Sequence, residues 1–257
     1  MTEAEWLACA DPAAMYKFLG GRASHRKWRL FACACCRRHW HWAADTPAAQ
    51  AVEVAERFAD GRATAKKLRA VQKETQDAAR QFYDEYRQTQ GVAPYIAHMH
   101  ASACADAAAA GHDTRASSAS YAISGANYAA QTYAYEITNT AGGVSDLWQA
   151  HKDAEAAAHA GVLRDVVGNP FRPVGFDPAW RTTDVRLLAE RIYNDRAFDQ
   201  LPILADALQD AGCGAERLLE HLRDPALLPW ERSDAAGPPP VEHARGCWAL
   251  DLVLGFA

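Results

Sequence analysis

Cysteine and histidine stand four residues apart at two places where the chain is expected to be helical. Cys35 and His39 form the first pair, and His100 and Cys104 form the second. Residues at this spacing share one face of a helix. Two such pairs on facing helices would supply two thiolates and two imidazoles to a tetrahedral zinc ion. The spacing therefore predicts one candidate zinc site.

A second group of the same residue types lies in the C-terminal part, near the ends of expected helices. Its members are Cys213, His221, His243 and Cys247. Neither group has the short Cys-x2-Cys spacing of a zinc ribbon. Buried thiols with hydrogen-bonded histidines would give the same pattern. Zinc binding is one interpretation of both groups, and a chain without a cofactor is the other.

Two of these cysteines are also candidates for a catalytic nucleophile. A nucleophilic cysteine needs a neighbouring base or a helix N-terminus to stabilise its thiolate. Cys35 has His39 on the same helix face but is expected deep in the core, whereas Cys213 follows Gly212 and is expected to be better exposed. No known nucleophile signature surrounds either residue, so buried or inert thiols are the simpler interpretation.

Paired carboxylates occur at helical spacing in Glu53 and Glu56 and again in Asp206 and Asp210. Such pairs would suit a glycosidase only across a cleft, and on helices they usually face solvent. The glycine-rich phosphate-binding motifs and the zinc deaminase motif are absent. The sequence therefore carries no recognisable catalytic signature, and the expected function is non-enzymatic.

Arg37 and Arg38 lie in an otherwise apolar segment. A buried guanidinium is costly without a partner, so both side chains should meet carboxylates or carbonyl groups. The C-terminal part offers Asp206, Asp210 and Asp251 as partners. We therefore expect structural ion pairs between these residues.

The segment that contains them, residues 24–45, is predicted to be one long helix at the centre of an all-α bundle. Ser24 can cap its start, and neither glycine nor proline interrupts the residues that follow. Apolar side chains occupy most of its circumference, which is typical of a helix surrounded by others.

The rest of the chain is also expected to be helical, because alternating strand patterns are missing. A proline-rich strap at residues 169–178 divides an N-terminal helical lobe, residues 1–168, from a C-terminal block in one single domain, residues 1–257. Caps and apolar periodicity predict further helices at residues 2–8, 12–19, 47–59, 65–90, 146–167, 183–198, 200–211, 215–223 and 242–254.

Residues 98–143 are rich in alanine, serine and tyrosine and poor in charge. Tyr121, Tyr128 and Tyr135 are seven residues apart, so they form one stripe on a helix. Core packing with the hydroxyl groups at the rim explains such a stripe. The alternative is a surface for a protein partner or for self-association.

Composition excludes several other classes. The 257 residues carry a net charge of −5, whereas nucleic-acid-binding domains are usually strongly basic. No segment resembles a signal peptide or a membrane span. Seven cysteines, three of them crowded on one expected helix, indicate reduced thiols. The expectation is a cytoplasmic protein that contacts neither nucleic acid nor membrane.

Several sequence blocks resemble an uncharacterised family with many paralogues in planctomycete-type bacteria. The blocks are MTEAEWLACADP, RLFACACCRR, GNPFRP, LPILADALQDAGC and RGCWALDLVLG. The resemblance implies no activity. Relatives often read His-Cys-Arg where this chain has His221-Leu222-Arg223, so a ligand set that needs a cysteine at position 222 is missing here.

Taken together, the sequence favours a helical scaffold or protein-interaction module that is not an enzyme. A zinc-binding protein with Cys/His pairs on facing helices is the first alternative. A small-molecule-binding or hydrolytic enzyme without a recognisable motif is the second.

Overall fold

Helices dominate the part of the chain that the structure describes, a computed structural model of residues 1–109, 115–140, 148–224 and 241–256. No strand occurs among these residues, which confirms the all-α class. The helices are α1 (Glu3–Ala8), α2 (Pro12–Leu19), α3 (His25–Arg37), α4 (Pro47–Ala59), α5 (Ala65–Thr89), α6 (Val92–Ala109), α7 (Arg115–Thr140), α8 (Trp148–Val167), α9 (Thr183–Asp195), α10 (Leu201–Asp210), α11 (Glu216–Arg223) and α12 (Trp248–Leu254).

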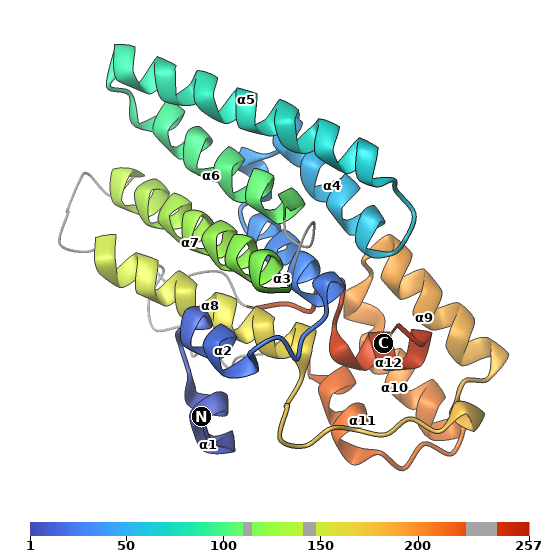
Figure 1. The fold of residues 1–257 in the computed structure, drawn as a ribbon. Coiled ribbons are helices and arrows are strands. Elements are labelled where there is room, and N and C mark those ends of the chain that lie inside the picture. The colour runs from blue at the N-terminus through green and yellow to red at the C-terminus, as the bar shows by residue number, and fades with distance from the viewer. Residues whose placement is uncertain (110–114, 141–147, 225–240, 257) are drawn as a thin grey trace.

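The long helices α5 to α8 lie beside one another, and the short helices α9 to α12 gather at one end of this stack (Figure 1). Helix α3 contacts α4, α6, α7 and α8, so it lies inside the bundle. Within the described residues, no helix combines the length and the apolar character needed to span a bilayer.

The expected central helix is confirmed as a buried element, but it is shorter than predicted. Ser24 caps α3 by accepting a hydrogen bond from the Lys27 backbone N–H at 3.3 Å. Every residue of 28–36 is buried. The helix ends at Arg37, and a short 3₁₀ turn at Trp40–Trp42 follows in place of the remaining predicted turns.

The early end of α3 has a physical reason in the contacts that follow it. His39 leaves the helical conformation, with φ −120° and ψ 41°. Its ring then reaches Glu155 of α8 at 3.1 Å, and the Trp40 ring lies 4.2 Å from the Arg37 guanidinium. The long-range bond of His39 to Glu155 and the local stacking of Trp40 on Arg37 together outweigh the preference for a longer helix.

Both arginines at the end of α3 pair with carboxylates, but the partners differ from those predicted. Arg37 donates to Glu56 of α4 through Nε at 2.7 Å and Nη2 at 2.9 Å. Arg38 donates to Glu155 of α8 through Nε at 2.5 Å and Nη2 at 2.9 Å. Both glutamates belong to helices of the N-terminal lobe rather than to the C-terminal block.

The three predicted aspartates lie elsewhere. Asp251 is buried and pairs with Arg26, whose Nη1 lies 2.6 Å from its carboxylate. Asp206 pairs with Arg223 at 2.8 Å on the surface, and Asp210 is exposed at the end of α10. Asp251 thus attaches α12 to the start of α3. The other two aspartates lie on α10, within the C-terminal block.

Buried hydrophobic side chains form two clusters. One draws on helices α1 to α8, and the other on α9 to α12. The strap crosses between them: Phe171 stacks on Phe18 of α2 at 5.2 Å, and Phe176 packs edge-on against Trp180 at 5.5 Å. These aromatic contacts hold the strap against the core.

The tyrosine stripe of α7 runs from the surface into the bundle. Tyr121 is exposed, whereas Tyr128 and Tyr135 are half-buried. Tyr135 packs edge-on against Tyr95 of α6 at 4.8 Å. Packing accounts for Tyr135, and a partner surface at Tyr121 stays a prediction.

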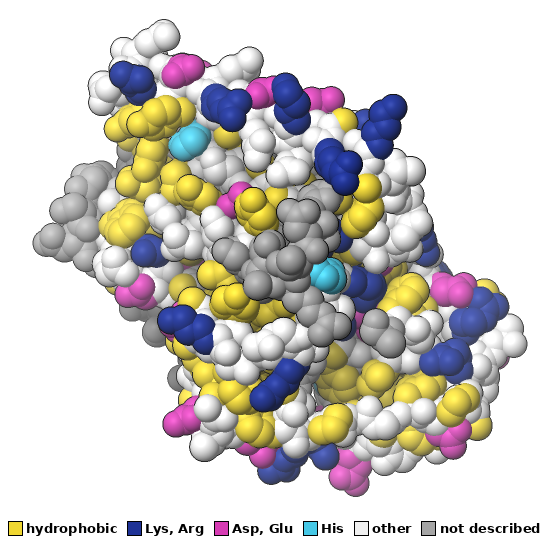
Figure 2. Space-filling view, viewed as in Figure 1, with side chains coloured by type: hydrophobic (Ala, Val, Ile, Leu, Met, Phe, Trp, Pro, Cys, Tyr) yellow, Lys and Arg dark blue, Asp and Glu magenta, His cyan; other side chains and the backbone are white. Residues whose placement is uncertain are grey.

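Figure 2 shows charged side chains along α5 and hydrophobic ones collected at the end where α5 meets α6.

Candidate metal centre

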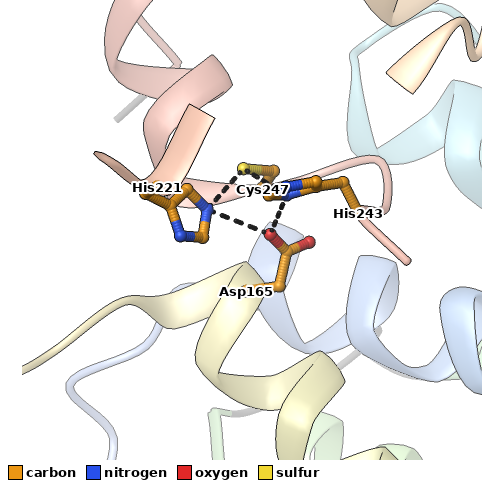
Figure 3. Close-up of side chains that lie close together, drawn as sticks. All are labelled: Asp165, His221, His243 and Cys247. Atoms are coloured by element: carbon orange, nitrogen blue, oxygen red, sulfur yellow. Dashed lines mark hydrogen bonds and ion pairs between the residues drawn. The ribbon is translucent and has the colours of Figure 1, made fainter. Parts of the chain in front are cut away.

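Four side chains that can ligate a metal converge between α8 and the C-terminal helices (Figure 3). They are Asp165, His221, His243 and Cys247, and their ligand atoms all lie within 4.8 Å of one another. His243 Nδ1 and His221 Nε2 lie 2.9 Å and 3.2 Å from Asp165 Oδ1. Cys247 Sγ lies 3.2 Å from His221 Nε2 and 3.8 Å from His243 Nδ1.

Three segments that are distant in the sequence supply these groups. Asp165 stands in the last turn of α8, and His221 stands near the end of α11. His243 and Cys247 come from the irregular segment that precedes α12, and Cys247 is the residue before its first turn. The site therefore lies where the N-terminal lobe meets the C-terminal block.

The segment before α12 corrects one helix prediction. The sequence predicts a helix over residues 242–254, yet α12 begins only at Trp248. Gly246 has φ +89°, a left-handed conformation that interrupts a helix and favours glycine. The resulting turn brings the Ala244 N–H to 2.9 Å from Asp165 Oδ2, so the segment is tied to α8 by its backbone.

Gly246 also lies against α3, which makes it a sensitive position. A Cβ atom added there would lie 2.8 Å from Leu30 Cδ1. We expect Gly246→Ala to lower the free energy of unfolding by about 1–3 kcal/mol, because it combines backbone strain with overpacking. Urea denaturation would measure the loss.

Gly214→Ala is the matched control for that substitution. A methyl group added at Gly214 would have no atom within 4 Å, and the residue has no positive φ. Its variant should therefore stay within about 1 kcal/mol of the wild type. Equal stability of the two variants would contradict the role given to Gly246.

The atoms of His243 and Asp165 that point away from the cluster form hydrogen bonds with the backbone. His243 Nε2 lies 2.8 Å from the backbone carbonyl oxygen of Asp224, so this nitrogen donates and Nδ1 faces the cluster. Asp165 Oδ2 accepts from Ala244, which turns Oδ1 inward. Hydrogen bonds to the far atoms of a ligand fix its orientation and are characteristic of protein metal sites.

Burial and charge set the protonation of the group. Burial alone raises the pKa of Asp165, but hydrogen bonds from His221 and His243 outweigh it and hold the pKa well below its usual value. Burial lowers the pKa of His243, and the bond to Asp165 raises it above the ordinary value. Burial raises the pKa of the Cys247 thiol. Metal binding at this site must therefore displace protons.

The spacing of the ligand atoms suits a tetrahedral ion. Zinc bonds of about 2.0–2.3 Å place neighbouring ligand atoms about 3.3–3.6 Å apart. The four separations given above run from 2.9 Å for His243 and Asp165 to 3.8 Å for Cys247 and His243. All six separations lie within 4.8 Å, so side-chain shifts of about 1 Å would be needed to place the four atoms around one ion.

The C-terminal candidate set is thus assembled in part. Three of its members, His221, His243 and Cys247, are brought together, whereas Cys213 is buried in the second hydrophobic cluster and takes no part. Asp165 completes the group, and sequence reasoning missed it. Its only local signal is a carboxylate on a helix whose neighbouring residues are buried and apolar, such as Leu163 and Val166.

The N-terminal candidate set does not assemble. His39 bonds to Glu155, and His100 Nε2 lies 3.2 Å from the Cys36 carbonyl oxygen. Cys104 Sγ lies 3.6 Å from His100 Nδ1 within its own helix. Cys35 is fully buried, and burial raises the pKa of its thiol well above the usual value. These groups serve as packing and hydrogen-bonding partners among the described residues.

The remaining catalytic candidates also lack a suitable setting. Cys213 is 4% exposed, which corrects the expectation that it is accessible. Glu56 is buried and paired with Arg37, whereas Glu53 is exposed, so the two carboxylates do not face one cleft. Among the described residues, Asp165, His221, His243 and Cys247 form the cluster whose geometry would suit a metal ion.

No protein-family model, curated protein or solved structure matches this chain. The resemblance to the planctomycete-type family therefore stays a prediction.

Proposed function

We propose that this protein is a non-enzymatic, zinc-binding helical protein in which the ion joins the C-terminal block to the N-terminal lobe. The observation that carries the proposal is the convergence of four ligand atoms within 4.8 Å, contributed by three distant segments. Thiolate, imidazole and carboxylate in one tetrahedral group are the ligands that zinc takes in proteins.

The number of ligands and their burial support a structural ion over a catalytic one. Catalytic zinc keeps an open position for water or substrate, whereas structural zinc has four protein ligands. Cys247 is fully buried, and the side chains of Asp165 and His243 are at most 2% exposed. The His221 side chain is 15% exposed and faces Trp248. Four protein ligands would leave no coordination position open for water or substrate.

Such an ion would add to the contacts that hold the C-terminal block in place. No residue of the strap, residues 169–178, is buried, although its aromatic side chains pack against the two hydrophobic clusters. An ion that bonds to α8, α11 and the segment before α12 would supply a direct connection there. A protein that is held together in this way suits a scaffold or interaction role. The partner in that role stays a prediction from the sequence.

Metal analysis of the full chain, purified without added metal, tests the proposal. We expect about one equivalent of zinc per chain. Replacement of the ion by cobalt(II) should produce the visible absorption of a tetrahedral site together with a thiolate-to-metal charge-transfer band. Absence of bound metal, combined with no spectral change on addition of cobalt(II), would refute zinc binding.

A further inference from the structure

A cavity of about 380 Å³ lies beside the metal centre, between α3, α4 and the C-terminal block. Its volume falls within the range of small-molecule pockets. Four arginines contribute to its lining: Arg37, Arg38, Arg196 and Arg245. The chain as a whole has a net charge of −5, so four guanidinium groups around one cavity make this a locally basic site.

One buried carboxylate is shared among three of these arginines. Arg37 binds Glu56 with two hydrogen bonds, at 2.7 Å and 2.9 Å. Arg196 donates to Oε2 of the same carboxylate, and Arg245 Nη1 lies 3.9 Å from that oxygen. The bidentate pair with Arg37 already neutralises Glu56, so the other two guanidiniums bring positive charge in excess.

The other carboxylates near the cavity do not remove this excess. Glu155 is the partner of Arg38. Glu242 lines the cavity but is exposed, so water screens its charge. The pKa of Arg196 is lowered, because burial and the charges of Arg37 and Arg245 outweigh the opposing effect of Glu56.

The remaining walls suit the organic part of a ligand. Trp40, Phe198 and Leu30 line the cavity together with the arginines. The Trp40 ring lies on the Arg37 guanidinium at 4.2 Å, which holds the fork of that arginine in place. A few directed polar groups within apolar walls are the usual composition of a small-molecule site.

We propose that this cavity binds a small molecule through an oxyanion group, a phosphate or a carboxylate, held by Arg37, Arg196 and Arg245. Glu56 occupies the fork of Arg37, and Arg245 donates Nε and Nη2 to the backbone carbonyls of Tyr193 and Asn194. The oxyanion would therefore accept charge-assisted hydrogen bonds from Arg196 and from the Nη1 groups of Arg37 and Arg245. His243, one of the proposed zinc ligands, also borders the cavity. The oxyanion would bind the arginines and would not need His243. The proposal therefore does not rest on zinc binding.

Isothermal titration calorimetry on the full chain, as purified, tests this site. Inorganic phosphate and succinate are the two probes, each titrated against a sodium chloride reference of matched ionic strength. We expect saturable binding of at least one probe, weakened about tenfold or more by Arg196→Gln, which removes charge-assisted hydrogen bonds. Binding of phosphate alone would assign a phosphate ligand, and binding of succinate alone a carboxylate ligand.

Arg186→Gln is the matched control, because Arg186 is an exposed arginine on α9 that pairs with Glu190 at 2.6 Å. This variant also removes one positive charge, but at a position away from the cavity. It should leave the affinity for phosphate and succinate unchanged. Where Arg196→Gln does not fold, Arg196→Lys carries the test, since it keeps the charge and loses the fork. No saturable binding of either probe, or equal binding by the wild type and the Arg196 variant, would overturn the proposal.

Discussion

Replacing Cys247 by alanine is expected to abolish the proposed zinc binding and to destabilise the protein more than any other single cysteine substitution. The thiolate is the softest of the four ligands, and the variant leaves Asp165, His221 and His243 with an incomplete coordination shell. An ion that binds only the folded chain stabilises it by about 4 kcal/mol when free zinc exceeds the dissociation constant a thousandfold. The variant should lose that amount.

Urea denaturation in defined free zinc, with metal analysis of the same samples, measures both effects. The wild type should become less stable when zinc is removed by a chelator, and the Cys247→Ala variant should respond little. The wild type in chelator and the variant in zinc should then have similar free energies of unfolding. This agreement would separate loss of the ion from loss of a buried thiol.

Cys213→Ala is the matched control for this experiment. Cys213 is also buried, at 4% exposure, but it lies in the second hydrophobic cluster and outside the ligand group. We expect it to keep one zinc per chain and to lose about 1 kcal/mol from packing alone. The assignment of Cys247 would be contradicted if the Cys247→Ala variant still bound one zinc per chain. It would also be contradicted if the chelator left the free energy of unfolding of the wild type unchanged.

Local signals in the sequence predicted most of the helices. Ser24, Thr46 and Thr64 cap α3, α4 and α5 by accepting hydrogen bonds from backbone amides of the first turn. A cap and the helix it begins are separated by a few residues, so a pattern of residue types is enough to find them. The buried character of α3 follows in the same way from its apolar circumference.

The candidate metal centre required information that no local pattern holds. Asp165 and His221 are on different helices, separated by the strap and by α9 and α10. The segment before α12 has helical spacing between His243 and Cys247, and only the left-handed Gly246 shows that the backbone turns there. Sequence reasoning could collect the three nitrogen and sulfur ligands, but it could not distinguish Asp165 from the many other acidic residues.

The ion pairs illustrate the same limit. The cost of burying a guanidinium predicts that Arg37 and Arg38 have carboxylate partners, and both do. Which carboxylates they meet depends on the direction in which α3 crosses α4 and α8. That crossing is decided by packing of the whole bundle, so Glu56 and Glu155 could not be chosen over Asp251 from the sequence.

Glu56→Gln is the second substitution for which we expect a large loss of stability. Glu56 is 2% exposed and is the carboxylate shared by Arg37 and Arg196. Glutamine keeps the shape but replaces one acceptor oxygen with an NH2 group, which faces a guanidinium donor. Removal of one partner from a buried ion pair costs about 3–5 kcal/mol, because the remaining charges stay buried.

The stabilisation that Glu56 provides through its ion pairs depends on pH. Burial alone raises the pKa of Glu56, but the hydrogen bond and charge of Arg37, followed by Arg196, lower it below the ordinary value of 4.5. A lowered pKa in the folded state stabilises the protein above the unfolded value, and this contribution disappears as pH falls through the folded value. The stability difference between wild type and variant should be constant from about pH 7 to 5 and should shrink below about 4.5.

Glu53→Gln is the matched control, because it removes the same charge from an exposed position three residues earlier on α4. Exposed carboxylates contribute little, so this variant should stay within about 0.5 kcal/mol of the wild type. The double variant Glu56→Gln with Arg196→Gln should be more stable than Glu56→Gln alone, since one of the uncompensated guanidiniums is gone. Additive losses in this cycle would show that Arg196 does not depend on Glu56, and the account of the shared carboxylate would then be wrong.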